Sequence, residues 1–190
     1  MIGNPNRVMR AGLFVLCLSF CASMAFEARG EAYIKFGDIK GESEATGHDE
    51  WCEIISFEHE IQRSTESSTN NLPARETVTV GEIVVVKELD NASPQLAEAC
   101  LKGAAIPFVE IEVIFPASNP DRLTYYTYEL KNVTVISYTI SGSGQSNERP
   151  IEQLSLHFDE IRVTYLLTPD PQSGLHFEIG YEWKVELRDS

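Results

Sequence analysis

The chain has 190 residues, of which 43% are hydrophobic and 23% are charged, a composition typical of a folded protein rather than of a disordered chain or a rod. Its 15 lysines and arginines stand against 29 aspartates and glutamates, which gives a formal net charge of −14. Because so acidic a surface repels phosphate groups, we expect no nucleic-acid partner and no stable membrane insertion.

Residues 1–25 have the pattern of a secretory signal peptide. Two arginines precede the uncharged run AGLFVLCLSF, and mostly small residues follow it up to Ala25. The charge-free stretch from 11 to 26 has 16 residues, fewer than the ~20 that a membrane-spanning helix needs. We therefore expect cleavage after Ala25 and a secreted or periplasmic protein. A lipoprotein with Cys21 modified is the alternative, although Phe20 stands where a small residue is expected.

Residues 26–190 are expected to form a single domain. Cleavage removes two arginines and no acid, which leaves 13 bases, 29 acids and a net charge of −16 on 165 residues. Alternating or β-branched apolar residues predict seven strands in this domain. In chain order the predicted strands are 32–36, 51–61, 82–89, 106–115, 123–141, 151–167 and 175–187.

Two of these strands carry a more detailed prediction. In the sixth, the apolar positions change parity between Phe158 and Ile161, which indicates a β-bulge near residues 159–160. In the last, apolar residues alternate strictly from Leu175 to Leu187, which is typical of a half-buried strand with one polar face.

One helix is predicted over Ser93–Lys102. Ser93 is the expected N-cap, Pro94 suits the first helical position, and Gly103 follows where a C-cap belongs. The expected apolar face consists of Leu96, Ala97, Cys100, Leu101 and Ala104. The sequence therefore predicts a mostly β fold, closed or sandwiched, with one packed helix.

The chain offers little that is typical of an active site. His59 and His157 lie near acidic residues on predicted strands, but no third ligand follows at a recognisable spacing for a metal. We therefore expect no enzyme, no catalytic residue, no metal and no cofactor. The polar segment 64–79 is long for a connection between two strands, and loops of that length are usually functional or mobile.

Cys52 and Cys100 are the two cysteines that remain after cleavage. Because an exported protein meets an oxidising compartment, they are candidates for a disulfide bond. The alternative is that they are two independent small residues in the core.

Several segments in fixed order resemble the haemolysin-coregulated protein (Hcp) family, the tube protein of type VI secretion. AYIKFGDIKGES resembles the opening strand and turn of the family, and IISFEHEIQR its second long strand. EIVVVKELDNASPQLAEACLKG is similar to its strand and helix. The most specific block is YELKNVTVISYTISGSGQSNERPIEQLSLHFDEIRVTY, which resembles its paired long strands. The resemblance extends from about Tyr33 to Leu187.

The resemblance implies a β-barrel of two sheets with one packed α-helix. It also implies a hexameric ring, stacking of rings into a secreted tube, effector proteins in the lumen, and no catalytic residues. The family carries an extended loop that reaches the next ring at the position of 64–79. The candidate stacking residues in this loop are Glu66, Leu72, Arg75 and Glu76.

One feature departs from the family pattern. Tube proteins of this family ordinarily lack a cleaved signal, because the tube assembles in the cytoplasm. The signal-like residues 1–25 therefore leave an alternative, in which the chain is an exported Hcp-like binding or surface module that is not part of a contractile apparatus.

Overall fold

The structure is a computed structural model that describes residues 31–66, 75–115, 123–145, 147–167 and 177–185. Within them the chain forms one helix and nine strands, in agreement with the predicted mostly β fold. In chain order these are β1 (Glu31–Phe36), β2 (Cys52–Glu53), β3 (Ser56–Glu66), β4 (Arg75–Glu88), α1 (Ser93–Lys102), β5 (Ala105–Phe115), β6 (Leu123–Ser141), β7 (Ile151–His157), β8 (Glu160–Leu167) and β9 (Phe177–Lys184).

The nine strands belong to one branched antiparallel sheet. Its hydrogen-bonded order is β2–β1–β5–β6–β7–β4–β3, with β8 paired to β6 and β9 paired to β8. The branch arises because β6 is long enough to serve two partners along the same edge. Residues 126–131 pair with β8, whereas residues 134–141 pair with β7.

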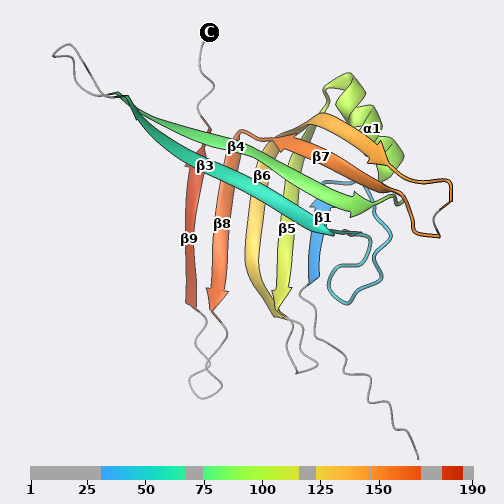
Figure 1. Cartoon of the computed structure of the whole chain (residues 1–190). Helices are drawn as coiled ribbons and strands as arrows, with labels where there is room; N and C mark the ends of the chain where they lie inside the picture. Colours follow the sequence, from blue (N-terminus) through green and yellow to red (C-terminus); the bar gives the residue numbers. More distant parts are fainter. Residues whose placement is uncertain (1–30, 67–74, 116–122, 146, 168–176, 186–190) are drawn as a thin grey trace, which may run out of the picture.

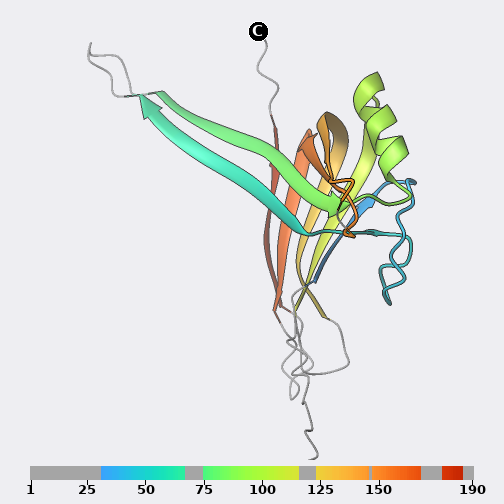
Figure 2. The same ribbon diagram turned by 45° about the vertical axis from the view of Figure 1, so that its right-hand side comes forward.

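Beyond the branch the sheet continues as two layers (Figure 2). The first layer is β2–β1–β5–β6–β8–β9, and β7, β4 and β3 form a second layer that crosses it obliquely (Figure 1). Buried residues of both layers form one hydrophobic cluster, which includes Ile34, Phe36, Ile83, Val85, Leu130, Leu154, Leu156, Phe158 and Ile161. The expectation of a β-barrel made of two sheets is therefore wrong for the described residues, which form one branched sheet that is not closed. The two layers share β6, and the end strands of the described sheet do not pair with one another to close it.

Two predicted strands are interrupted where the chain changes partners. The strand over 151–167 divides into β7 and β8 at residues 158–159, which confirms the predicted irregularity. Both halves pair with β6, whose register with β7 shifts between Val135 and Ser137, and the partner on the opposite edge changes from β4 to β9. The strand over 51–61 divides in a similar way. The N–H of Ile54 donates to Ala32 O in the first layer, and the N–H of Ile55 donates to Val86 O in the second.

The predicted loop 64–79 is strand at both of its ends, and residues 67–74 lie outside the described residues. β3 continues to Glu66, and β4 begins at Arg75, which is the Cα partner of Glu66. The two strands form a long hairpin that extends away from the rest of the molecule (Figure 2). Gly81 lies at a bulge in this hairpin, where a Cβ atom would approach Glu60 O to 2.9 Å, so that a larger residue would force the strands apart.

Helix α1 packs against β6 and contributes Ala92 and Leu96 to the core. It ends as predicted, with Gly103 in the left-handed conformation at φ 59°, but its N-cap is Ala92 rather than Ser93. Leu101 is 88% exposed, so the predicted apolar face is wrong at that position. Within the described residues, the chain has no helix that combines the length and the hydrophobicity needed to cross a membrane.

Candidate assembly surfaces

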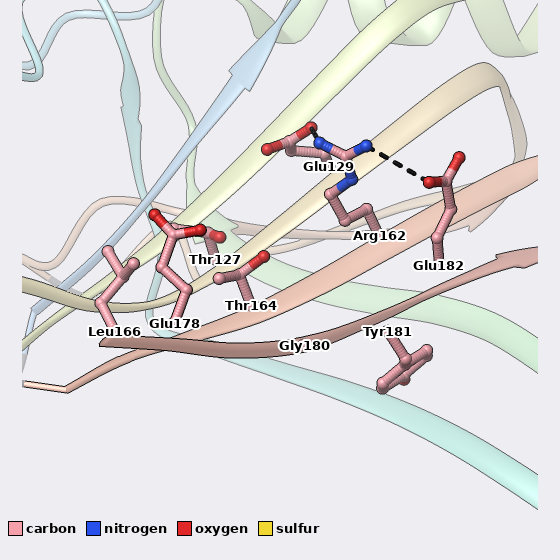
Figure 3. A pocket seen from close by; sticks show the side chains of 9 residues that line it. All are labelled: Thr127, Glu129, Arg162, Thr164, Leu166, Glu178, Gly180, Tyr181 and Glu182. Carbon is pink, nitrogen blue, oxygen red and sulfur yellow. Dashed lines mark hydrogen bonds and ion pairs between the residues drawn. The ribbon is translucent and has the colours of Figure 1, made fainter. Parts of the chain in front are cut away.

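The outer face of the first layer carries a row of charged side chains across five strands. Residues that pair directly in neighbouring antiparallel strands lie on the same face of a sheet. The row consists of Lys35, Glu110, Glu129, Arg162 and Glu182. Arg162 lies between two carboxylates, with its guanidinium nitrogens 3.8 Å from Glu129 Oε2 and 3.2 Å from Glu182 Oε2 (Figure 3). The positive charge of Arg162 therefore offsets the negative charges of its two neighbours in the row.

A second charged row lies next to the first. Glu160 accepts hydrogen bonds from Lys131 and forms an ion pair with Lys184, each with an N–O distance of 2.7 Å. The hydrogen bonds from Lys131 and Lys184 lower the pKa of Glu160 to about 2. Exposed pairs of this kind stabilise a fold only slightly. Their effect is to give the face a polar surface whose charges are already paired.

A shallow groove of about 510 Å³ lies in the same outer face, over β6, β8 and β9 (Figure 3). Its floor includes Gly180, where a Cβ atom would approach Val163 O to 2.4 Å. Glu178 and Glu182 lie on either side of this glycine along β9. No group of three or more His, Cys, Asp or Glu residues in the described part is arranged to hold a metal ion.

The inner face of the first layer is apolar but incompletely covered. Tyr181 and Trp183 pair across from the buried core residues Val163 and Ile161, so they point toward the second layer. They are nevertheless 45% and 48% exposed, and Ile179 is 64% exposed. The predicted half-buried face is therefore wrong at Ile179, Tyr181 and Trp183, although Val185, just after β9, packs against the core. Leu175 and Leu187 of the same pattern lie outside the described residues. The β3–β4 hairpin diverges from β9 and leaves this end of the first layer uncovered (Figure 2).

The facing side of the hairpin is apolar as well. Ile61 follows the inward-pointing Phe57 and His59 at two-residue spacing, and it pairs with Val80, which packs against the core. Ile61 is half-exposed, as are several large inward-pointing side chains of β8 and β9. We call this set the inner apolar surface: Ile61, Val78, Tyr165, Ile179, Tyr181 and Trp183.

Aromatic rings connect the inner apolar surface to the core. Tyr165 contacts Tyr126 with ring centroids 6.4 Å apart, and Tyr126 contacts Tyr128 at 5.3 Å. Tyr128 in turn contacts His59 at 5.9 Å, and His59 contacts Phe158 at 5.9 Å. Burial raises the pKa values of Tyr128 and Tyr181, so these hydroxyls stay neutral at physiological pH. The inner apolar surface is thus continuous with the packed interior.

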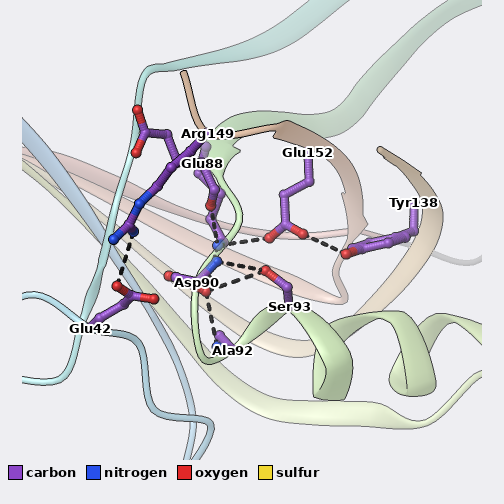
Figure 4. A network of polar contacts seen from close by, with 9 residues as sticks. Glu42, Glu88, Asp90, Ala92, Ser93, Tyr138, Arg149 and Glu152 are labelled. Atoms are coloured by element: carbon purple, nitrogen blue, oxygen red, sulfur yellow. Dashed lines mark hydrogen bonds and ion pairs between the residues drawn. The ribbon is translucent and has the colours of Figure 1, made fainter. Parts of the chain in front are cut away.

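A buried ionic network fixes the start of α1 against both layers (Figure 4). Lys87 is fully buried, and its Nζ lies 2.7 Å from Glu152 Oε1 and 2.7 Å from Asp90 Oδ1. Tyr138 donates a hydrogen bond of 2.5 Å to the other oxygen of Glu152. Burial opposes the charge on Lys87, but the hydrogen bonds to Asp90 and Glu152 outweigh it and raise its pKa. Asp90 also accepts from the N–H of Ala92 at the start of the helix.

A second polar cluster attaches the segment 37–51 to the first layer. The Nε2 of His48, which is buried, donates to Glu112 Oε2 at 2.8 Å, and the hydroxyl of Thr124 donates to the same oxygen at 2.7 Å. The His48 ring stacks on Tyr33 with centroids 4.4 Å apart and meets the edge of Trp51 at 4.9 Å. This histidine therefore has a structural role.

Comparison with known proteins gives one family. Residues 33–165 match the family described as "Type VI secretion system effector, Hcp". The chain belongs to the Hcp family of type VI secretion. This family consists of structural secretion proteins rather than enzymes, in agreement with the expectations from sequence.

Individual relatives agree with the family assignment. Protein hcp1 of Pseudomonas aeruginosa is 28% identical over 157 residues, which cover 82% of this chain and 94% of the relative. A solved type six secretion system protein is 27% identical with a TM-score of 0.70, over 83% of this chain and 96% of that one. A type VI secretion effector from Yersinia pestis is 21% identical with a TM-score of 0.61, over 81% and 99%, and supports the fold alone.

The structure places some of the predicted site residues of this Hcp-family chain. Glu66, Arg75 and Glu76 lie in paired strands near the end of the β3–β4 hairpin, whereas Leu72 lies outside the described residues. Their part in stacking stays a prediction.

The two cysteines both contact the hydrophobic core but are not bonded to each other. Cys52 is buried and Cys100 is partly buried, and both are free thiols in the structure. Burial, with a smaller effect of the nearby Asp90, raises the pKa of Cys52, so its thiol is poorly reactive. The predicted disulfide stays a prediction for the exported protein.

Sequence reasoning missed the main features of both surfaces. The alternation of β9 identified its apolar face but not that this face is left uncovered. Lys87 and Glu152 are also absent from the predicted sites, although each stands among apolar neighbours at an inward-pointing strand position. A charged residue at an inward-pointing position of an otherwise apolar strand face indicates a buried ion pair, and this was the signal in the sequence that could have identified Lys87 and Glu152.

Proposed function

We propose that the mature chain 26–190 is a ring-forming tube subunit of type VI secretion, with six copies in each ring and rings stacked into a secreted tube. The observation that carries the ring is the inner apolar surface. Single exposed apolar residues are ordinary on a protein surface, but Tyr165, Ile179, Tyr181 and Trp183 are neighbours on one face of β8 and β9, and such a group rich in aromatic residues is typical of protein–protein interfaces. Tyr181 and Trp183 are the expected anchors.

The open edge of β9 supports the same proposal. β9 pairs with β8 alone among the described strands, so its other edge presents unpaired backbone groups beside the inner apolar surface. A neighbouring copy that covers the surface can also satisfy these groups. This arrangement explains why the strand keeps an apolar face that its own chain leaves uncovered.

Stacking of rings is assigned to the end of the β3–β4 hairpin. Glu66, Arg75 and Glu76 lie there and carry charges of both signs, which suits a weak contact that gains strength from repetition around a ring. Leu72 belongs to the same proposed contact. A variant in which a short glycine-containing turn replaces residues 65–78 should form single rings but fail to stack in electron micrographs. Stacks as long as those of the parent would contradict this assignment.

We propose that residues 1–25 direct export and are cleaved off near Ala25, and that effector proteins carried in the lumen are the cargo. The basic, apolar and small-residue pattern of 1–25 supports export, and it equally favours the alternative of an exported Hcp-like module outside a contractile apparatus. N-terminal sequencing of protein from the native host tests the cleavage. A mature protein that starts at Phe26 supports it, and an intact Met1 contradicts it.

The ring proposal is tested by sedimentation velocity on matched variants. W183S removes an exposed aromatic residue from the inner apolar surface, and L101S removes an exposed apolar residue from α1, away from that surface. We expect the parent and L101S to sediment as hexamers and W183S to sediment mainly as monomers. Hexamers of W183S as stable as those of the parent would overturn the assignment of this surface.

A further inference from the structure

His59 lies where the β3–β4 hairpin meets the first layer. Its ring makes an edge contact with Tyr128 of β6, with centroids 5.9 Å apart and planes at 79°. It makes a second edge contact with Phe158, between β7 and β8, at 5.9 Å and 69°. Its partner across the hairpin, Ile83, is fully buried. His59 is therefore part of the packing that holds the hairpin on the sheet.

The surroundings of His59 disfavour the protonated, charged form of its imidazole. Its Nε2 atom is buried and has no hydrogen-bond partner among the described residues. Burial lowers the pKa of His59 below its usual value of 6.5. A protonated imidazole would place an unpaired charge between two aromatic rings, which is unfavourable in an apolar environment.

Among the residues that the structure describes, no group facing His59 compensates that charge. Tyr128 on β6 is the titratable group in contact with the ring, with Tyr126 and Tyr181 beyond it. Burial raises the pKa values of Tyr128 and Tyr181, so neither hydroxyl supplies a negative charge in this pH range. On β4 the inward residues around His59 are the aliphatic Val80, Ile83 and Val85, and the inward Lys87 farther along the strand is paired with Asp90 and Glu152. At the β7–β8 junction the carboxylate of Asp159 accepts a hydrogen bond from Asn132. On β3 itself, Glu58 and Glu60 alternate with His59 and point to the opposite face.

We propose that His59 is an acid-sensitive latch between the β3–β4 hairpin and the first layer, and that its protonation favours opening of the hairpin and so weakens the inner apolar surface. Ile61 lies two residues after His59 on the same face of β3 and belongs to that surface. A hairpin that leaves the sheet therefore removes one side of the surface. The consequence for rings rests on the proposed function, whereas the latch itself is a property of the single chain.

The sign of the pH dependence follows from the lowered pKa. The open hairpin exposes His59 to water and binds a proton at the ordinary pKa, so opening becomes more favourable as the pH falls below about 6.5. If the imidazole stays neutral in the closed state, the equilibrium constant for opening of the hairpin increases by as much as about tenfold as the pH falls from 7.5 to 5.5. Above pH 7.5 the latch has no further effect.

Hydrogen exchange tests the latch directly. Amide exchange in 56–63 and 78–86, corrected for the intrinsic pH dependence, is measured at pH 7.5 and 5.5 in the parent, in H59F, in H59L and in H157F. We expect the parent and H157F to lose up to about tenfold in protection at pH 5.5, and both His59 variants to lose much less. A pH dependence in H59F and H59L equal to that of the parent would overturn the proposal.

Two further readouts complete the test. The C2 proton of His59 is titrated by NMR in the parent, so a measurement remains if the variants do not fold. A titration midpoint at or above 6.5 would overturn the latch, and a lower midpoint supports it. Ring content at both pH values separates the two proposals. If amide exchange of the hairpin depends on pH through His59 but no rings form at any pH, only the proposed function is contradicted. If rings form but amide exchange of the hairpin does not depend on pH, only the latch is contradicted.

Discussion

Replacing Lys87 by methionine should strongly destabilise the fold. The side chain is fully buried, and its Nζ is the cation that lies 2.7 Å from both Glu152 and Asp90. Methionine keeps most of the volume but leaves the Glu152 carboxylate buried without its counter-charge. Removal of one partner from a buried ion pair typically costs about 3–5 kcal/mol. That is a large part of the about 5–15 kcal/mol that stabilises an ordinary domain.

Urea unfolding at neutral pH measures this loss, and two further variants make it interpretable. K40M removes a lysine whose ion pair with Glu50 is exposed, and it should leave the free energy of unfolding unchanged within error. K87M combined with E152M removes both buried charges, so it should be more stable than K87M alone, although Tyr138 then loses its acceptor. A loss below about 1 kcal/mol in K87M would refute the argument that the buried pair controls this region.

Three other measurements test separate parts of the structure. The pKa of Glu160 is about 2 in the fold against a usual 4.5, so the stability that its carboxylate contributes is lost as the pH falls from 4.5 to 2. In E160Q the free energy of unfolding should therefore decrease less over this pH interval than in the parent. G180A should lower the melting temperature by disturbing β8–β9, while G144A, whose added Cβ meets nothing within 4 Å, should not. Intact mass without reductant should show exported protein two hydrogens lighter if Cys52 and Cys100 pair; two free thiols in it would contradict the disulfide.

The sequence predicted the strands and the helix well because their signals are local. Alternation along each strand, Pro94 near the start of the helix and Gly103 at its end depend on neighbours in the chain. The interruption at residues 158–159 was also predictable, because a change of parity must accompany a change in the face that is buried.

Features that depend on distant partners were not predictable in the same way. The branch at β6 requires two different strands on one edge, and nothing in the strand itself indicates that. The apolar face of β9 predicted burial, but the geometry of the hairpin decides whether its own chain supplies the cover. The extension of β3 and β4 into the polar segment 64–79 shows the same limit, since strand pairing there overrides a composition typical of loops.

A cryo-electron microscopy reconstruction of the mature chain tests the central claim most directly. The account predicts a six-membered ring in which Tyr181 and Trp183 are buried against the neighbouring copy and the open edge of β9 is covered. A ring that leaves both side chains in solvent, or a chain that remains monomeric at high concentration, would contradict it.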